Sequence, residues 1–244
     1  MADKPLNLIL DYRTSEKELR KLLSFGFNLI STEKVTSLYD AVDGHPDLQF
    51  FLIGNKLIAH KDLSENQMKL LQKLEVTVRL GNSSLTLPYP KNIPYNALLT
   101  PDLMMHRLDA TDSVVLDEIR ELKKTKEITL VNVRQGYSRC SCAYVGNNSY
   151  ITEDVVMAKK LISLGKDVFY RKHSNVYLKG FDFGFIGGAI SLISGNDDEI
   201  VVISGSLDFY FYGKELKVFL AQRSIRYECL SEGKLMDRGS IITF

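Results

Sequence analysis

The chain repeats one short pattern of β-rich runs, turns and helix starts along most of its length. The stretch FLIGNKLIAH at 51–60 holds two apolar runs joined by a Gly-Asn turn, and a helix signal follows it. The stretches at 97–106, 143–152 and 191–205 have the same layout, with Gly, Asn, Asp or Pro at the turn. Because sequence periods of roughly 20–50 residues are typical of repeat architectures, this recurrence limits the fold more than any other feature.

A helix is predicted after each pair of apolar runs. Ser15–Glu18 and Ser64–Gln67 have the spacing of capping boxes, and Gly165 is placed to end a helix in the left-handed conformation. The fourth helix, predicted within 206–223, is the least regular because Gly213 interrupts it. Another β-rich run follows each helix, so each unit is predicted to run strand, strand, helix, strand.

The loops between units end at markers about 46 to 55 residues apart, namely Gly44, Pro90, Gly136, Gly184 and Gly239. The last β-rich run, 239–244, has no hairpin partner after it. The first segment, 1–43, lacks the first strand of a unit, so the two segments together make one complete unit. We therefore predict one α+β domain, 1–244, whose five ββαβ units form a closed pseudo-fivefold ring, an α/β propeller around a central channel. The units are approximately 44–89, 90–135, 136–183, 184–238, and 239–244 with 1–43.

A closed ring of ββαβ units resembles the pentein fold of guanidino-group-modifying enzymes, and the ending LMDRGSIITF looks most like a bacterial branch of that fold. The resemblance implies a cysteine in the last strand that attacks the guanidinium carbon, a histidine that moves protons, and carboxylates that hold the cation. The histidine-bearing segment is similar to 180–193, where Asp182 takes the histidine's place. The nucleophile would fall at Gly239 or Thr243, and no cysteine follows Cys229. The resemblance therefore implies the fold and argues against the standard deiminase, amidinotransferase or dimethylargininase activity.

Equivalent positions of the units are predicted to converge on the channel. The positions just before the markers hold charged and hydrogen-bonding side chains that would be costly to bury without partners or a ligand. The acids would receive a positive charge and the arginines a carboxylate, so an amino-acid-like or guanidino ligand is expected. The alternative is that these side chains pair with one another across a solvated channel. The predicted ligand-binding residues are Asp43, Tyr89, Arg134, Gln135, Asp182, Asp237 and Arg238.

Cys140 is a second candidate, as the nucleophile of an atypical hydrolase or transferase. It stands four residues after its marker, as Thr243 does in the last unit, and is predicted to share one side of a strand with Cys142. Arg139 beside it would favour a thiolate, whereas the simpler interpretation is an inert buried cysteine.

No metal ion and no other cofactor is expected from the sequence. The Cys140-x-Cys142 pair has no second pair, and His45 and His173 are far from it in the sequence. His60 and His106 occupy equivalent positions of adjacent units, each just before a predicted helix. Histidines are common at the partly exposed ends of strands, so this does not indicate a metal site.

Composition narrows the possible partners. The 244 residues carry a formal net charge of +1, which gives no basic field for nucleic acid. No apolar run approaches a membrane span, and three cysteines suit free thiols in a reducing cytoplasm, so a cytoplasmic protein is expected. Three functions remain: a non-catalytic protein that binds a small polar ligand in the channel, an atypical enzyme using Cys140, and a protein- or ribosome-binding factor. The oligomeric state stays open.

Overall fold

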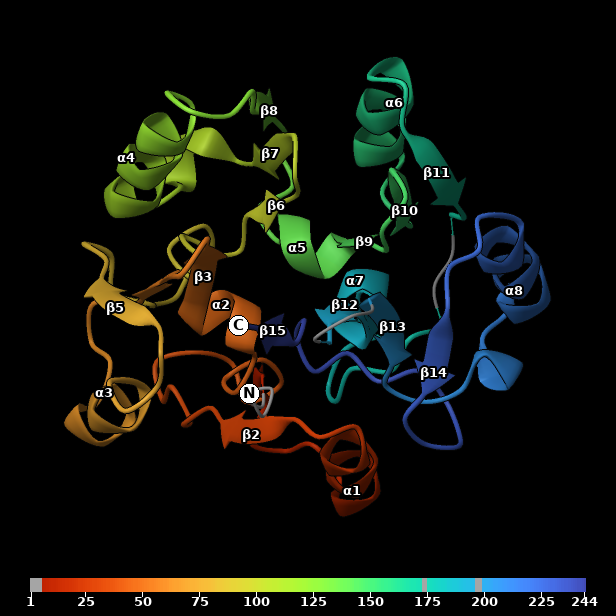
Figure 1. Ribbon diagram of the computed structural model, residues 1–244, viewed down its shortest axis with the longest axis horizontal. Coiled ribbons are helices and arrows are strands. Elements are labelled where there is room, and N and C mark those ends of the chain that lie inside the picture. Colours follow the sequence, from red (N-terminus) through yellow and green to blue (C-terminus); the bar gives the residue numbers. More distant parts are fainter. Residues whose placement is uncertain (1–5, 173–174, 196–198) are drawn as a thin grey trace, which may run out of the picture.

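Five small β-sheets of three strands each form the frame of the molecule (Figure 1). The computed structural model describes residues 6–172, 175–195 and 199–244. His173 lies outside these ranges. The first sheet joins both ends of the chain and contains β15 (Ile242–Thr243), β1 (Asn7–Leu10) and β2 (Asn28–Ser31). The next two sheets contain β3 (Phe50–Ile53), β4 (Lys56–Ala59) and β5 (Thr77–Leu80), then β6 (Leu98–Leu99), β7 (Leu103–His106) and β8 (Thr129–Asn132). The last two contain β9 (Cys142–Tyr144), β10 (Ser149–Thr152) and β11 (Asp167–Tyr170), then β12 (Ile190–Ser194), β13 (Glu199–Ile203) and β14 (Tyr227–Cys229).

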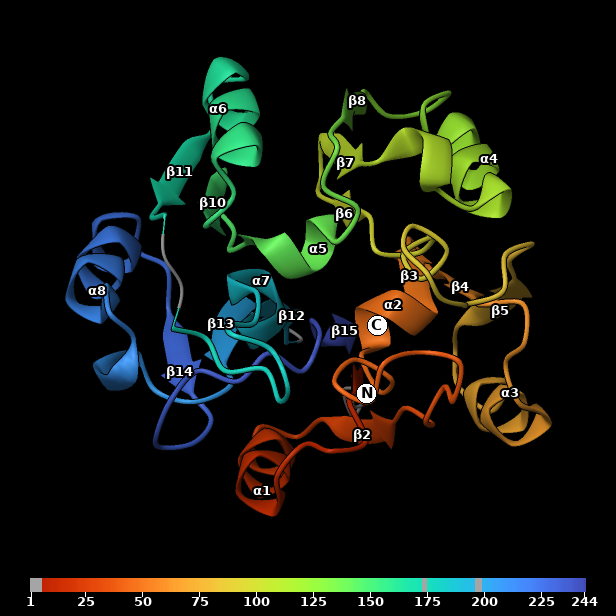
Figure 2. The same ribbon diagram turned by 180° about the vertical axis from the view of Figure 1, so that it is seen from behind.

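Each sheet has the same strand directions. The first two strands pair antiparallel, as Phe50 does with Ala59, and the third pairs parallel with the second, as Leu57 does with Val78. A parallel neighbour requires a crossover, which a helix supplies in every unit. These helices are α1 (Glu16–Ser24), α3 (Glu65–Leu71), α4 (Ser113–Leu122), α6 (Val155–Ser163) and α8 (Gly213–Gln222). Figures 1 and 2 show them on the outside, with the five sheets around a common centre. The predicted α+β class is confirmed.

Local sequence signals explain where most of these helices begin and end. Ser15 and Glu18 form the reciprocal capping box at the start of α1. Ser64 accepts a hydrogen bond from the Gln67 amide, but the Gln67 side chain donates to the Ser31 carbonyl, so this box is only half formed. Gly165 follows α6 with a φ of +73°, the left-handed stop that the sequence predicts.

The expected break at Gly213 is wrong. Gly213 is the first residue of α8, after a short 3₁₀ turn, η2 (Leu207–Phe209). A Cβ at Gly213 would overlap the Leu207 carbonyl oxygen, so the glycine allows the turn and the helix to approach closely. A second 3₁₀ turn, η1 (Leu108–Ala110), precedes α4.

The two ends of the chain meet near the centre of the molecule (Figure 1). β15 pairs antiparallel with β1, with Leu8 opposite Thr243 and Ile9 opposite Ile242. Ile9 and Ile242 are fully buried and belong to one apolar cluster with Phe50 and Leu57 of the next unit. The pairing of the last strand with the first segment, predicted from the sequence, is therefore confirmed. In the described ranges every helix is too short or too polar to cross a membrane.

Three one-turn helices that the sequence did not predict lie at the inner ends of the units: α2 (Pro46–Gln49), α5 (Ser138–Ser141) and α7 (Ile186–Ala189). Each runs directly into a first strand, β3, β9 or β12. Cys140 lies in α5, so the prediction that it shares a strand with Cys142 is wrong. Counted back from the strand, Cys140 matches Ser240 and not Thr243, because each stands two residues before its strand.

Candidate ligand site at the centre of the fold

A cavity of about 280 Å³ lies where the inner loops of several units meet. Four of its lining residues share one position, five residues before the first residue of a strand. Because equivalent positions of the units face the same centre, residues far apart in the sequence meet here. These four are His45, Tyr137, Phe185 and Asp237. The other lining residues are Tyr39, Val42, Cys140, Leu178, Phe181, Asp182 and Phe183.

Three chemically active side chains meet at the buried end of the cavity. His45, Cys140 and Asp237 are 1%, 1% and 5% exposed, and one ligand atom from each lies within 4.8 Å of the others. The His45 Nδ1 and the nearest Asp237 oxygen are 3.8 Å apart, too far for a hydrogen bond. Neither ring nitrogen of His45 has a hydrogen-bond partner among the described residues. A buried imidazole without partners is costly, so this arrangement points to an interaction with a further group.

Cys140 is held by polar side chains from two other units, and Ser240 of a third unit holds one of them. Its Sγ–H donates to the Asp47 carboxylate at 3.1 Å, and the Asn96 amide donates to Sγ at 3.3 Å. The Ser240 amide and hydroxyl donate to the same Asp47 oxygen at 2.8 and 2.9 Å. Burial, together with the negative charges of Asp47 and Asp237, raises the pKa of Cys140 well above its usual value. The thiol is therefore protonated at neutral pH unless a cation enters the cavity.

Asp237 is oriented by the backbone. The Phe185 amide donates to one of its oxygens at 2.8 Å, and the Gly239 amide donates to the other at 3.1 Å. Burial raises the pKa of Asp237 above its ordinary value. Gly188 of α7 leaves the space that this carboxylate occupies, because a Cβ there would overlap an Asp237 oxygen.

The open end of the cavity is aromatic. Phe181 and Phe183 are 51% and 55% exposed, and the Tyr39 and Phe181 rings meet edge to face at 6.2 Å. Deeper in, Tyr137 packs against Phe185 at 5.7 Å. Asp182 is exposed between the two phenylalanines and has no hydrogen-bond or ion-pair partner in the part of the chain that the structure describes. None of the described lining residues is Lys or Arg, so the cavity attracts positive charge.

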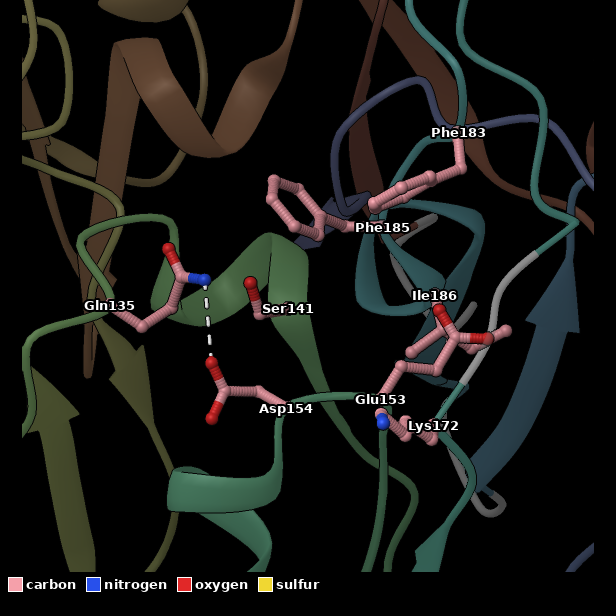
Figure 3. A pocket seen from close by; sticks show the side chains of 8 residues that line it. All are labelled: Gln135, Ser141, Glu153, Asp154, Lys172, Phe183, Phe185 and Ile186. Atoms are coloured by element: carbon pink, nitrogen blue, oxygen red, sulfur yellow. Dashed lines mark hydrogen bonds between the residues drawn. The ribbon is translucent and has the colours of Figure 1, made fainter.

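A second pocket of about 240 Å³ shares the walls Phe183 and Phe185 (Figure 3). Its other lining residues are Gln135, Ser141, Glu153, Asp154, Lys172 and Ile186. Figure 3 shows the Gln135 amide directed at Asp154, to which it donates at 3.5 Å. Asp154 also caps α6, and Glu153 accepts a hydrogen bond from Tyr210. The side chains of Gln135, Asp154 and Glu153 therefore already form hydrogen bonds within the fold.

The structure brings three of the predicted site residues together, since Asp182, Asp237 and Cys140 line the central cavity. Gln135 lines the neighbouring pocket. The remaining four lie outside both sets of lining residues. Arg134 is exposed, and its carbonyl accepts a hydrogen bond from Tyr89. Arg238 donates to the Arg13 carbonyl and lies 3.5 Å from Glu18. Asp43 contacts Tyr12, Arg13 and Lys34.

His45 was not predicted as a site residue, although a signal for it exists. It directly follows the marker Gly44, as Tyr137 follows Gly136 and Phe185 follows Gly184. In the last unit the equivalent marker is Met236 and not Gly239, so Asp237 occupies the same position. Gly239 lies three residues after Met236. A register that takes Gly239 as the marker therefore does not align Asp237 with His45.

Three solved structures of guanidino-modifying enzymes are similar to this chain. An inosamine-phosphate amidinotransferase from Streptomyces griseus matches with a TM-score of 0.57 and 11% identity, covering 94% of this chain and 89% of that one. A saxitoxin-pathway amidinotransferase from Microseira wollei gives 0.54 and 10%, covering 94% and 89%. A dimethylarginine dimethylaminohydrolase bound to S-methyl-L-thiocitrulline gives 0.54 and 9%, covering 93% of each chain. These enzymes have the pentein fold, and so does this chain.

Comparison of the sequence itself with known proteins gives one match. No curated protein sequence matches the chain. One family profile matches residues 9–242, nearly the whole length, and its description is "Family of unknown function (DUF6873)". The chain therefore belongs to the DUF6873 family, a family of unknown function whose structure here is of the pentein type.

Proposed function

We propose that this protein binds a small organic cation with a planar guanidinium or amidinium group in the central cavity. The observation that carries this proposal is the lining: five aromatic rings and two carboxylates, with no Lys or Arg among the described lining residues. Aromatic faces attract cations through their negative quadrupole, most strongly where water is excluded. Asp237 would meet the cation at the buried end, and Asp182 would attract it at the mouth.

The proposal includes the closed ring, with the cavity at its channel. Three features support closure: the pairing of β15 with β1, the contact between α5 and α7, and the hydrogen bonds from Ser240 to Asp47. Four units supply the equivalent residues His45, Tyr137, Phe185 and Asp237, which a ring would bring to one place.

The fold likeness adds a second support. The names of the similar structures describe the transfer of amidino groups and the hydrolysis of dimethylarginine. A cation of this class suits the charge and the aromatic walls of the cavity better than the zwitterion expected from the sequence. A zwitterion would need a cationic partner for its carboxylate, and Arg134 and Arg238 do not line the cavity.

The test is a calorimetric and thermal-shift panel of guanidine, agmatine, arginine and choline, run on the wild type and on Asp182→Asn and Asp237→Asn. Each variant should bind its best cation about 10- to 100-fold more weakly, because hydrogen bonds to charged groups contribute about 1.5–3 kcal/mol. Asp208→Asn removes an exposed carboxylate on η2 that pairs with Lys217 outside the cavity, and it should leave cation binding unchanged. A panel in which no cation stabilises the wild type would reject the proposal.

A second candidate is catalysis by Cys140, which the meeting of a thiol, an imidazole and a carboxylate favours. His45 would take the thiol proton as the sulfur attacks the central carbon of the bound cation and forms a C–S bond. The C–N bond would then break and release an amine that carries the proton. Water would hydrolyse the thioester-like adduct to a ureido or amide product and return the thiol.

The catalytic candidate has its own test. Amine release from the panel compounds should occur with the wild type and stop with Cys140→Ser, while Cys229→Ser, which changes a thiol on β14, should remain active. Cation binding without amine release would leave the protein as a binding module.

A further inference from the structure

We propose that His45, Cys140 and Asp237 form a zinc-type metal site whose open coordination position faces the central cavity. This inference does not depend on the organic cation proposed above. The three residues come from three units, and each is at least nine-tenths buried. One ligand atom of each lies within 4.8 Å of the other two.

The donor set fits a borderline-soft transition metal. A thiolate, an imidazole and a carboxylate are the ligands that proteins offer to Zn²⁺, whereas Mg²⁺ and Ca²⁺ prefer oxygen alone. Zinc binds nitrogen and oxygen at about 2.0 Å and sulfur at about 2.3 Å, so neighbouring ligand atoms of this set lie roughly 3.3–3.6 Å apart around one ion. The 3.8 Å between His45 Nδ1 and Asp237 Oδ1 is about 0.5 Å longer than a bound N···O pair. All three ligand atoms lie within 4.8 Å of one another, so movements of about 1 Å would complete the site.

His45 supplies the independent observation. It is 1% exposed, and both of its ring nitrogens lack a hydrogen-bond partner among the described residues. His106, a buried histidine elsewhere in the fold, bonds Thr111 and the Gly136 carbonyl through its two nitrogens. The contrast shows that this fold can satisfy a buried imidazole with protein groups. At His45 it leaves the imidazole free to bind a ligand.

The surroundings hold the other two ligands in place. Two backbone amides orient the Asp237 carboxylate, and the Asn96 amide donates to Cys140 Sγ. Such outer hydrogen bonds orient metal ligands and tune their affinity. When zinc binds, the thiol proton is released to solvent, and Asp47 keeps both donors from Ser240.

Charge balance makes the metal compatible with the cation proposed for the cavity. The thiolate and the Asp237 carboxylate together balance the charge of a divalent ion, and the Asp47 carboxylate, 3.1 Å from the sulfur, lies beside them. With the metal bound, Asp237 no longer meets the organic cation directly, and Asp182 and the aromatic rings of the mouth attract it. Three protein ligands leave a fourth position for water or for a donor atom of the bound molecule, as in catalytic zinc sites.

The test uses Co²⁺, which reports on its ligands by colour. Chelator-treated wild type should bind one Co²⁺ with a thiolate-to-cobalt charge-transfer band in the near ultraviolet, and one equivalent of Zn²⁺ should abolish the band. Cys140→Ser should lose the band, and Cys229→Ser should keep it. His45→Gln should weaken zinc binding more than about 100-fold, since even outer-shell changes cost 10- to 100-fold.

A folded wild type without the band, or a band that survives Cys140→Ser, would overturn the proposal. If Cys140→Ser does not fold, X-ray absorption of zinc-loaded Cys229→Ser decides, because Cys140 and Cys142 are then the remaining cysteines. One sulfur at about 2.3 Å from zinc is expected, and a coordination shell of nitrogen and oxygen alone would reject the site. Asp182→Asn should leave the cobalt band unchanged while it weakens organic-cation binding, so the two proposals fail separately.

Discussion

At the residue scale, Gly188 determines whether Asp237 can face the cavity. A Cβ at this position would overlap an Asp237 carboxylate oxygen, while the Gly188 carbonyl accepts a hydrogen bond from the Arg238 amide. We expect Gly188→Ala to destabilise the fold by about 1–3 kcal/mol, the usual cost of overpacking a buried site. Denaturant unfolding measures the change. An alanine variant with wild-type stability and wild-type cation binding would show that Asp237 does not need this space.

Two buried histidines give the protein a defined acid sensitivity. Burial lowers the pKa of His60 and of His106 from 6.5 to about 4. The unfolded chain therefore binds protons between about pH 6.5 and pH 4 that the folded chain does not, so stability is complete above this window and falls as the pH drops through it. His60→Gln removes one of these two groups and should therefore reduce the pH dependence of stability by about half. Melting curves at pH 7, 5 and 4 check this, and parallel curves for both proteins would contradict it.

Asp182 and Asp237 were predictable as candidate site residues because they precede glycine markers. His45 was not, because its meaning depends on a register that only the strand positions define. Cys140, predicted to face the channel, lines the central cavity, but Arg139 does not make it a thiolate. The carboxylates of Asp47 and Asp237, distant in sequence, act in the opposite direction on its pKa.

At the element scale, Asp112 joins the start of α4 to a neighbouring loop. One of its oxygens caps the helix at the Val114 amide, and the other accepts from Asn82, Ser83 and Tyr95. We expect Asp112→Ala to lose roughly 2–4 kcal/mol, because the buried Val114 amide and the partly buried Asn82 and Ser83 amides would lose their acceptor. Ser15→Ala removes only the cap of α1 and should cost about 1 kcal/mol. Chemical denaturation compares the two, and equal losses would show that the loop contacts add nothing.

The amphipathic helices and the hairpins could be predicted from the sequence, since their periodicity extends over many residues. The one-turn helices α2, α5 and α7 could not, because four residues are too few to show a helical period. Two of the cavity's reactive groups depend on these short helices, since Cys140 lies in α5 and His45 directly precedes α2. The elements that position the site are therefore those with the weakest sequence signal.

At the scale of the whole molecule, the last strand holds both ends of the chain together. β15 pairs with β1, Ile242 is fully buried, and Asp237 and Ser240 reach the centre. Deleting residues 237–244 should unfold the domain, because it removes an inner strand and the buried hydrogen bonds of Ser240. Circular dichroism and thermal melting report the outcome. A truncated protein with an unchanged melting temperature would contradict the closed ring.

The central claim is that the cavity selects positive charge, and a pair of molecules that differ in charge but hardly in shape tests it most directly. Agmatine and N-carbamoylputrescine are such a pair, since a ureido oxygen replaces one nitrogen of the guanidinium and neither molecule carries a carboxylate. Calorimetric titration of the wild type should give at least about tenfold tighter binding of agmatine, because the cavity carboxylates contribute charge-assisted hydrogen bonds only to the guanidinium. Equal or tighter binding of N-carbamoylputrescine would contradict the account.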